Sequence, residues 1–330
     1  MKIGFIGCGG HAFKVYADSL RRIAAETPAL DLFLCCDIDA EKALRFAQEA
    51  GFACSSGDPA DALASGACDA LILATPYPIT AGLAARSLRA GIPTLMEKPP
   101  GGTLEQAESV ARAAKESGTP HQVAFNRRHI PLIRALKQNI LSENAALQHI
   151  DYAMYRVDRR EDHFYSTAVH GVDLISHLAS SPFERVSLHY ARMERFGEGV
   201  ENILMQSSFV SGASAQLSFC PVSGVLTERL VVTTDAATYY VNLPIWNAGD
   251  PIGSIAKYRE DRLLWERTGD EVGDGPNLFE NNGFYAQLHS FLADIAQGRA
   301  PADDIHSALD TMRIMDCMRL RQASYCRAES

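Results

Sequence analysis

The sequence predicts two folded units: a doubly wound parallel α/β sheet, followed by an α+β unit on a large, mostly antiparallel open sheet. Three observations support this. Short apolar runs alternate with helical patterns up to about residue 125. From 185 to 243, β-like runs follow one another without helices between them. The length of 330 residues suits two domains of about 150 residues each. We therefore expect a first domain at 1–126 and a second at 127–330.

Composition and charge limit the possible functions. Apolar residues make up 47% of the chain and charged residues 22%, as in globular proteins. A net charge of −9 argues against a nucleic-acid partner, because phosphates attract basic surfaces. The first apolar run, 3–6, is too short for a signal peptide, and no run has the length of a membrane span. The eight cysteines lack a paired metal-binding pattern, so we expect buried thiols in a reducing cytoplasm.

The amino terminus has a glycine-rich motif between a predicted strand, 1–6, and a predicted helix, 13–25. Gly7 permits a tight turn, Gly9 lets a pyrophosphate approach the backbone, and Ala12 lets the helix pack closely on the strand. The pattern predicts a dinucleotide site, and an ordinary glycine-rich turn is the alternative. The residues expected to line the cofactor here are Gly7, Gly9, Gly10, His11 and Ala12. Among these, His11 is expected to be a loop or helix-start residue and not a catalyst.

A second predicted strand, 30–36, ends at Asp37, where such folds place an acid on the adenosine ribose. A carboxylate there accepts hydrogen bonds from both ribose hydroxyls and repels a 2′-phosphate. We therefore expect NAD in preference to NADP. The other role open to Asp37 is the N-cap of a helix at 40–50, for which Asp39 is better placed.

A buried strand beginning at Ile92 ends in Glu97-Lys98-Pro99-Pro100. Ligands of open parallel sheets bind beyond the carboxyl ends of the strands, where a lysine polarises a hydroxyl or carbonyl oxygen. The two prolines stop the strand and restrict the backbone after the lysine. A surface lysine at a strand end is the alternative. The preceding strand, 70–74, is closed by Thr75-Pro76, so the further residues expected beside the cofactor are Thr75, Pro76, Glu97 and Lys98.

In the second half, His170, Asp173 and His177 are spaced by three and four residues. This spacing puts them on one face of a helix starting near Thr167, beside apolar side chains. Polar residues on a half-buried face have three explanations: catalysis, a metal, or a structural network.

Arg156, Arg159 and Arg160 either neutralise an acidic substrate or form a solvated charge cluster, and the interleaved acids favour the cluster. Tyr165 and Trp246 are expected to be pocket walls, with plain core packing as the alternative. An irregular loop is expected at 247–282, around Arg262 to Glu266, followed by closing helices at 283–297 and 304–322.

Four stretches follow one another along the first half of the chain: GFIGCGGHA, CCDIDAEKA, the run from LILATP to EKPPGG, and VAFNRRHIPLIRAL. Their order and spacing resemble the glucose–fructose oxidoreductase, inositol dehydrogenase and MocA family over essentially the whole first half. The motif H-x-x-D-x-x-x-H extends the resemblance into the second half. Two departures are Thr80, where relatives often have histidine, and the bulkier, more polar stretch 161–167 before the second-half helix.

The resemblance implies an NAD(P)-dependent oxidoreductase acting on a secondary hydroxyl of a sugar, cyclitol or related polyol. It implies catalysis by Lys98, Asp173 and His177. In the expected reaction His177 takes the hydroxyl proton, Asp173 sets the charge and orientation of His177, and Lys98 stabilises the alkoxide. The residues expected to contact substrate are Arg128, Tyr165, His170, Asp173 and His177. For Arg128, contact with Glu97 is the other option.

A large sheet must cover its outer face, so this face and the resemblance together predict a homodimer or homotetramer. The protein is further expected to be cytoplasmic and to have no resident metal. Two alternatives come from other classes. A non-catalytic dinucleotide or sugar sensor on the same fold would have no need for the lysine, aspartate and histidine together. A metal-dependent hydrolase or lyase would use His170, Asp173 and His177, but three ligands from one helix face give poor tetrahedral geometry.

Overall fold

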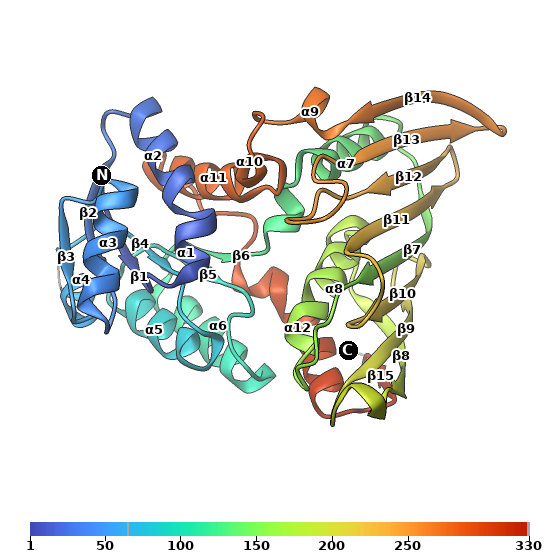
Figure 1. Ribbon diagram of the computed structural model, residues 1–330, viewed down its shortest axis with the longest axis horizontal. Helices are drawn as coiled ribbons and strands as arrows, with labels where there is room; N and C mark the ends of the chain where they lie inside the picture. Colours follow the sequence, from blue (N-terminus) through green and yellow to red (C-terminus); the bar gives the residue numbers. More distant parts are fainter. Residues whose placement is uncertain (65, 329–330) are drawn as a thin grey trace. The chain divides into compact units, whose positions relative to one another are not determined.

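The computed structural model describes residues 1–64 and 66–328 (Figure 1). The chain forms two compact units. The first consists of Met1–Asn126 together with Phe284–Leu309, and the second of Arg127–Gly283 together with the chain from Asp310 onward. The break after Asn126 is where the sequence analysis expected it. The return of 284–309 to the first unit was not expected, because nothing local in those residues indicates which unit they pack against.

The first unit is built on a six-stranded parallel sheet in the order β3-β2-β1-β4-β5-β6. The order reverses between β1 and β4, so the loops that follow these neighbouring strands lie at the switch point, where open α/β sheets bind ligands. This confirms the predicted doubly wound sheet. The strands are β1 (Lys2–Ile6), β2 (Asp31–Cys36), β3 (Cys54–Ser56), β4 (Ala70–Leu73), β5 (Thr94–Glu97) and β6 (His121–Ala124).

Helices connect these strands. The predicted limits of α3 and α6 are confirmed, and the Asp39 side chain caps α3 by accepting from the amides of Glu41 and Lys42. The single helix expected at 13–25 is instead two, which meet at Tyr16. The helices of this unit are α1 (Gly10–Val15), α2 (Ala17–Glu26), α3 (Ala40–Ala50), α4 (Ala60–Leu63), α5 (Tyr77–Arg89), α6 (Leu104–Ser117), α11 (Phe284–Ala296) and the start of α12 (Ile305–Arg319).

Specific contacts attach the carboxy-terminal segment to the first unit. Helix α11 packs on α2, where the Tyr285 hydroxyl donates to Glu26 over 2.5 Å and the Arg22 guanidinium lies 4.1 Å from the Tyr285 ring centroid. Farther along, the Val123 amide of β6 donates to the Asp303 carbonyl over 2.9 Å. These contacts explain why 284–309 belongs with the parallel sheet.

The second unit is built on a nine-stranded sheet in the order β14-β13-β12-β11-β7-β10-β9-β8-β15. Neighbouring strands are antiparallel except β10 and β7, which are parallel. This confirms the predicted large, mostly antiparallel sheet. The strands are β7 (Leu147–Tyr155), β8 (Phe183–Arg192), β9 (Glu201–Phe209), β10 (Ser214–Cys220), β11 (Thr227–Thr234), β12 (Thr238–Asn242), β13 (Ser254–Arg259), β14 (Arg262–Thr268) and β15 (Ser324–Cys326).

One face of this sheet is covered by helices, and buried and exposed residues alternate along its central strands. Helix α8 lies on β7 and β10, where a Cβ on Gly171 would approach Tyr152 to 2.4 Å, so only glycine permits this close packing. The helices of this unit are η1 (Asn126–His129), α7 (Pro131–Ser142), α8 (Tyr165–Ala179), η2 (Glu194–Phe196), α9 (Gly269–Val272), α10 (Leu278–Asn281) and the rest of α12.

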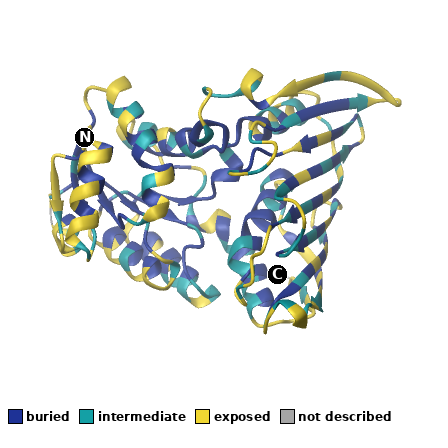
Figure 2. Cartoon of the chain, in the orientation of Figure 1, coloured by how far each residue is buried: buried dark blue, intermediate teal, exposed yellow. Residues whose placement is uncertain are grey.

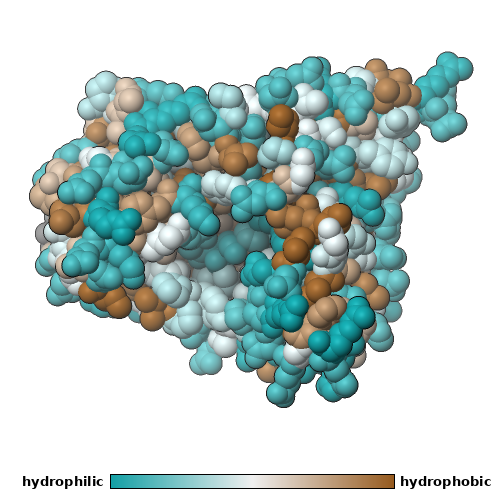
Figure 3. Space-filling model, viewed as in Figure 1, coloured by the Kyte–Doolittle hydropathy of each residue, from teal (hydrophilic) through white to brown (hydrophobic). Residues whose placement is uncertain are grey.

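The prediction that 247–282 is irregular was wrong. This segment contains the β13–β14 hairpin and the short helices α9 and α10, and β15 was also unforeseen. Strand β14 lies at the sheet edge with most of its side chains exposed (Figure 2), so it lacks the apolar alternation that marks a half-buried strand. Hydrophilic side chains gather at the far end of this hairpin (Figure 3).

The thiols match the expectation in part. Cys8, Cys35, Cys36, Cys68 and Cys317 are buried, but Cys54 and Cys326 are exposed, because they lie on short strands at the edges of the two sheets. Across the part of the chain that the structure describes, no helix combines the length and the apolar composition that crossing a bilayer requires.

Candidate functional site

The glycine turn follows β1 and leads into α1. Gly7 has φ +101°, and a Cβ there would lie 2.6 Å from the carbonyl oxygen of Ala74, so this position requires glycine. Gly9 and Gly10 face open space, since a Cβ on either would meet no atom within 4 Å. The turn therefore has backbone that a pyrophosphate can approach, at the start of a helix.

Asp37 lies directly after β2 and is half-buried. Its Oδ2 accepts from the Cys8 amide over 2.8 Å, and its Oδ1 accepts from the Asp39 amide over 2.9 Å. The carboxylate is thus fixed against the glycine turn. A carboxylate oxygen can accept more than one hydrogen bond, so both oxygens of Asp37 can also accept from ribose hydroxyls.

The turn after β4 is stabilised by two threonines. The hydroxyls of Thr75 and Thr80 lie 2.9 Å apart, and Thr80 also donates to the Thr75 carbonyl over 2.9 Å. Thr80 is fully buried. At the position where the family resemblance leads one to expect histidine, this chain therefore uses a short side chain that shapes the Thr75-Pro76 turn.

The end of β5 is connected to the glycine-turn helix through Glu97. Its Oε1 accepts from the Tyr16 hydroxyl over 2.7 Å and lies 3.1 Å from Nε2 of His11. Burial raises the pKa of the Glu97 carboxyl, but His11, Lys98 and Tyr16 outweigh this effect and lower the pKa below its usual value. The carboxylate is charged, and its Oε2 accepts from the Lys98 amide over 3.1 Å.

Lys98 itself is half-buried at the carboxyl end of β5, and its peptide bond to Pro99 is cis. The predicted cofactor residues of the first unit thus gather around three strand ends: the glycine turn after β1, Thr75-Pro76 after β4, and Glu97-Lys98 at the end of β5. Asp37 joins them through the Cys8 amide.

In the second unit, α8 begins at Tyr165, two residues before the expected start. His170 is 8% exposed, Asp173 is fully buried and His177 is half-buried. The helix presents these three residues beside core side chains such as Val172, as the spacing predicted. Their catalytic roles stay predictions.

Asp173 forms a two-pronged ion pair with Arg128. The guanidinium Nε donates to Oδ2 over 2.8 Å, and a terminal nitrogen donates to Oδ1 over 2.5 Å. The Thr311 hydroxyl of α12 lies 3.4 Å from Oδ1. Arg128 was predicted to orient substrate or Glu97, and the contact observed is with Asp173. This arginine fixes a buried carboxylate one helical turn before His177.

His177 has a neighbour that the sequence analysis missed. Lys137, from α7, lies with its Nζ 3.3 Å from Nε2 of His177 and 2.9 Å from the His177 carbonyl oxygen. No local signal could have found this contact. The helix containing Lys137 was predicted, but not which helix packs against it.

A second buried carboxylate, Glu228 on β11, was also missed. It accepts from Arg127 over 2.7 Å, from the Tyr152 hydroxyl over 2.7 Å, and from Arg156. Burial raises the pKa of Glu228, but Arg127 and Arg156 outweigh it and hold the pKa far below its usual range. Arg156 was predicted to be solvated, which was wrong. It directly follows β7, and the neighbouring strand β11 contains the buried Glu228 to which Arg156 donates.

Arg160 forms an exposed pair with Asp158, as predicted for a solvated cluster, whereas Arg159 pairs with the half-buried Glu161. The predicted pocket walls are both half-buried: Tyr165 packs against the core at the start of α8, and Trp246 follows β12.

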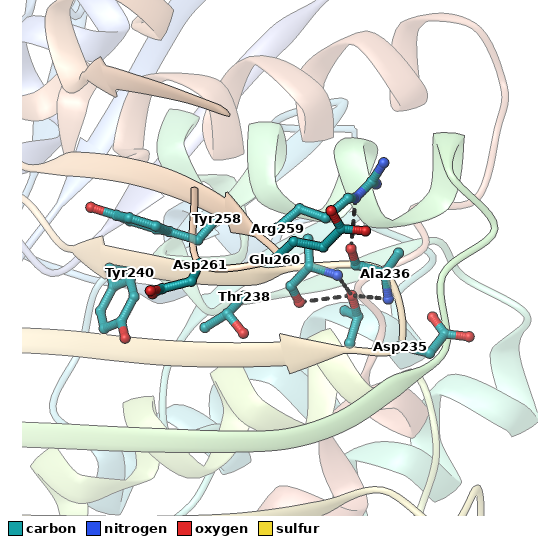
Figure 4. A pocket seen from close by; sticks show the side chains of 10 residues that line it. Asp235, Ala236, Thr238, Tyr240, Tyr258, Arg259, Glu260 and Asp261 are labelled. Atoms are coloured by element: carbon teal, nitrogen blue, oxygen red, sulfur yellow. Dashed lines mark hydrogen bonds between the residues drawn. The ribbon is translucent and has the colours of Figure 1, made fainter. Parts of the chain in front are cut away.

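A cavity of about 880 Å³ lies at the turns that join β11 to β12 and β13 to β14 (Figure 4). It contains none of the predicted site residues. Several of its polar groups stabilise the turns, since the Thr234 hydroxyl donates to the Ala237 carbonyl and Arg259 donates to the Ala236 carbonyl. We therefore do not assign the site there.

These features define the class of protein by its fold: a doubly wound parallel sheet with a glycine turn after its first strand, in a chain whose second unit is a large open sheet. Residues 1–125 match a family described as "Oxidoreductase family, NAD-binding Rossmann fold". The predicted resemblance to the glucose–fructose oxidoreductase, inositol dehydrogenase and MocA family is thus confirmed for these residues.

Two relatives illustrate the similarity. The chain is 24% identical over 336 residues to 4-carboxy-2-hydroxymuconate-6-semialdehyde dehydrogenase of Sphingobium sp. (strain NBRC 103272 / SYK-6), which covers 96% of each chain. It is 26% identical over 200 residues to inositol 2-dehydrogenase 1 of Saccharopolyspora erythraea, which covers 58% of each.

Among solved structures, levoglucosan dehydrogenase in complex with NADH and levoglucosan has a TM-score of 0.82 at 18% identity and covers 100% of each chain. A dehydrogenase from Chromobacterium violaceum has a TM-score of 0.83 at 20% identity and covers 98% of this chain and 95% of its own. At these identities the likeness shows the fold.

Proposed function

We propose that the protein is an NAD-dependent dehydrogenase that oxidises a secondary hydroxyl of a sugar, cyclitol or related polyol. One observation carries the proposal: the half-buried Lys98 follows a strand end that Glu97 connects to the glycine-turn helix. This arrangement suits a cation that must stay beside a bound dinucleotide. Relatives named inositol 2-dehydrogenase favour the polyol class.

Bound NAD⁺ would supply a hydride acceptor. In this proposal Gly7, Gly9, Gly10 and Ala12 lie along its pyrophosphate, and Thr75-Pro76 lies beside the nicotinamide. Lys98 stabilises the negative charge that develops on the substrate oxygen, and His177 takes the hydroxyl proton. Asp173 keeps its charge through Arg128 and contributes a fixed negative potential one turn from His177.

Asp37 supports NAD in preference to NADP. Amides of the glycine turn and of Asp39 fix its carboxylate, so it cannot readily turn away from a 2′-phosphate, which it would repel. Replacing Asp37 by serine should weaken NAD⁺ binding and narrow the difference between NAD⁺ and NADP⁺, measured by titrating nucleotide fluorescence.

A second candidate is oxidation of a carboxylated aldehyde. It is favoured by the relative that matches along 96% of both chains, whose name describes a semialdehyde dehydrogenase with a carboxy substituent. The same cation and base would serve the hydrate or hemiacetal of an aldehyde, which presents a hydroxyl on the carbon to be oxidised.

We also propose that the outer face of the nine-stranded sheet is covered by a second copy of the chain, in a homodimer or homotetramer. Leu204 and Tyr240 are exposed by 43% and 52%, and each alternates with buried residues of its strand, so both lie on the face away from the core. Light scattering after size exclusion tests this, and a Leu204→Glu variant should dissociate.

The decisive experiment is a turnover screen of the purified protein with NAD⁺ and NADP⁺. One arm contains polyols and sugars, beginning with myo-inositol and levoglucosan, and the other contains carboxylated aldehydes. NADH formation in the first arm supports the proposal, and formation in the second arm alone supports the second candidate. Nucleotide binding without turnover in either arm would indicate a non-catalytic sensor.

A further inference from the structure

Lys137 contacts His177 at two atoms, and the contact lies within the second unit. Its Nζ donates to the His177 carbonyl over 2.9 Å and lies 3.3 Å from Nε2 of the ring. Both side chains are half-buried. The sequence separation of 40 residues means that the fold, and not local chain geometry, brings the two together.

The chemistry of the two groups fixes the direction of the ring contact. An ammonium group has three donors and no acceptor, so Nε2 must be the acceptor. The ring is then neutral, and its hydrogen lies on Nδ1. The contact thus selects one tautomer and directs the Nε2 lone pair towards a hydrogen-bond donor.

A purely structural role explains only half of this geometry. The His177 carbonyl belongs to the last turn of α8, where a lysine can satisfy a carbonyl group, and here the hydroxyl of the C-cap residue Ser180 also donates to it over 3.3 Å. That role requires the carbonyl contact alone. The approach of the same ammonium to Nε2 is an additional feature.

We propose that Lys137 is a positioning residue for His177: it fixes the neutral ring with its lone pair on Nε2 and favours that basic form. The inference rests on the proposed function. In the absence of substrate the ammonium occupies the position of a donor to Nε2, and a substrate hydroxyl is a donor of the same kind. The hydroxyl would replace it while Lys137 stays bound to the His177 carbonyl.

Proton transfer then follows from the fixed lone pair. The substrate O–H bond would break and an N–H bond would form at Nε2, and bound NAD⁺ would supply the acceptor for the hydride that leaves the substrate carbon. The hydrogen on Nδ1 stays in place, so the product ring is an imidazolium. The nearby ammonium repels this cation, which favours release of the proton to water.

Two buried carboxylates near α8 are paired with opposite charges. Asp173, one turn earlier, is bound by Arg128 from η1 and contacts Thr311 of α12. On the sheet side, Glu228 is bound by Arg127 and Arg156, with Tyr152 donating to it. Lys137 of α7 is a cation in direct contact with the imidazole ring.

Nitrogen NMR of the protein labelled at histidine tests the proposal without any substrate. His177→Gln identifies the signal. The unchanged protein should show a neutral ring protonated at Nδ1. In Lys137→Met the titration midpoint of His177 should move to higher pH by about one unit, because a neighbouring positive charge is removed. Lys137→Arg should restore the original midpoint, since a guanidinium also donates without accepting.

Lys115→Met is the matched control. Lys115 is an exposed lysine in the last turn of α6. Its replacement therefore removes the same side chain and the same charge at another position of the chain. It should leave the His177 signal unchanged. A His177 signal that is the same in Lys137→Met as in the unchanged protein, or a ring protonated at Nε2, would overturn the proposal.

Kinetic measurements distinguish the effect of Lys137 on His177 from the proposed dehydrogenase reaction. If a polyol is turned over, the acidic limb of the kcat/KM profile should move with the NMR midpoint in Lys137→Met. If no substrate is turned over but the NMR shifts occur, Lys137 still sets the state of His177 and the proposed reaction fails. A moved midpoint with an unmoved kinetic limb would show that His177 is not the base, and would overturn the catalytic meaning of the contact.

Discussion

The two units stabilise their buried carboxylates by different means. In the first unit, Glu97 is bound by a tyrosine hydroxyl, a histidine ring and the backbone amide of Lys98. In the second, Asp173 and Glu228 are each bound by arginine. An arginine remains charged at any pH that proteins survive, whereas the groups that contact Glu97 are a neutral hydroxyl, a backbone amide and a histidine ring that is charged only when protonated. We infer that the second unit depends more on paired charge, and the first on hydrogen-bond geometry.

Loss of an arginine should have the largest effect. Arg128→Met leaves the fully buried Asp173 carboxylate without its counter-ion, so the free energy of unfolding should fall by about 3–5 kcal/mol. Urea denaturation measures this. Arg160→Met, which removes an exposed pair with Asp158, should cost about 1 kcal/mol or less. Equal losses in the two variants would contradict the view that paired charge stabilises the second unit.

Lys98→Met tests the first unit's part in the chemistry. Turnover should fall by about 10²–10³-fold, because a preorganised stabiliser of the developing oxyanion is removed. NAD⁺ binding, followed by fluorescence, should persist, since the glycine turn is unchanged. A Lys98→Met enzyme with normal turnover would refute the role proposed for this lysine.

Tyr16→Phe should have a smaller effect on folding. It deletes one hydrogen bond to the charged Glu97, which is worth about 1.5–3 kcal/mol. Thermal unfolding followed by circular dichroism measures the loss. If it equals that of Arg128→Met, hydrogen bonding and ion pairing contribute alike and the contrast between the two units disappears.

The acid side of the stability curve gives the smallest and most specific effect. The pKa of Glu97 is lower in the folded chain than the usual value of about 4.3, so its contribution is present above that pH. It is lost as the pH falls through the folded value. The stability difference between the unchanged protein and Glu97→Gln should therefore shrink as the pH falls below about 4. A difference that grows in acid would contradict this sign.

Local signals explain what the sequence could predict. The limits of α3 and α6, the Asp39 cap and the position of Lys98 after a buried strand all depend on residues within a few positions of one another. The alternation of strands and helices was sufficient to predict the parallel sheet. The glycine spacing was sufficient to expect a turn in which Gly7 has positive φ.

The missed features depend on contacts between distant residues. Arg128 meets Asp173 across 45 residues, Arg127 meets Glu228 across 101, and Lys137 meets His177 across 40. A charged residue looks solvated in a sequence unless its partner is known, as Arg156 illustrates. The β13–β14 hairpin was missed because an exposed edge strand lacks an apolar face.

The route of the chain has a consequence for how the protein is made. Because 284–309 packs on α2 and β6, the first unit stays incomplete until residues 127–283 and the helices that follow them have left the ribosome. A fragment ending at residue 126 would expose the apolar surface that α11 covers. To study the first unit alone, residues 284–309 would have to be fused to residues 1–126 through a short linker that replaces 127–283.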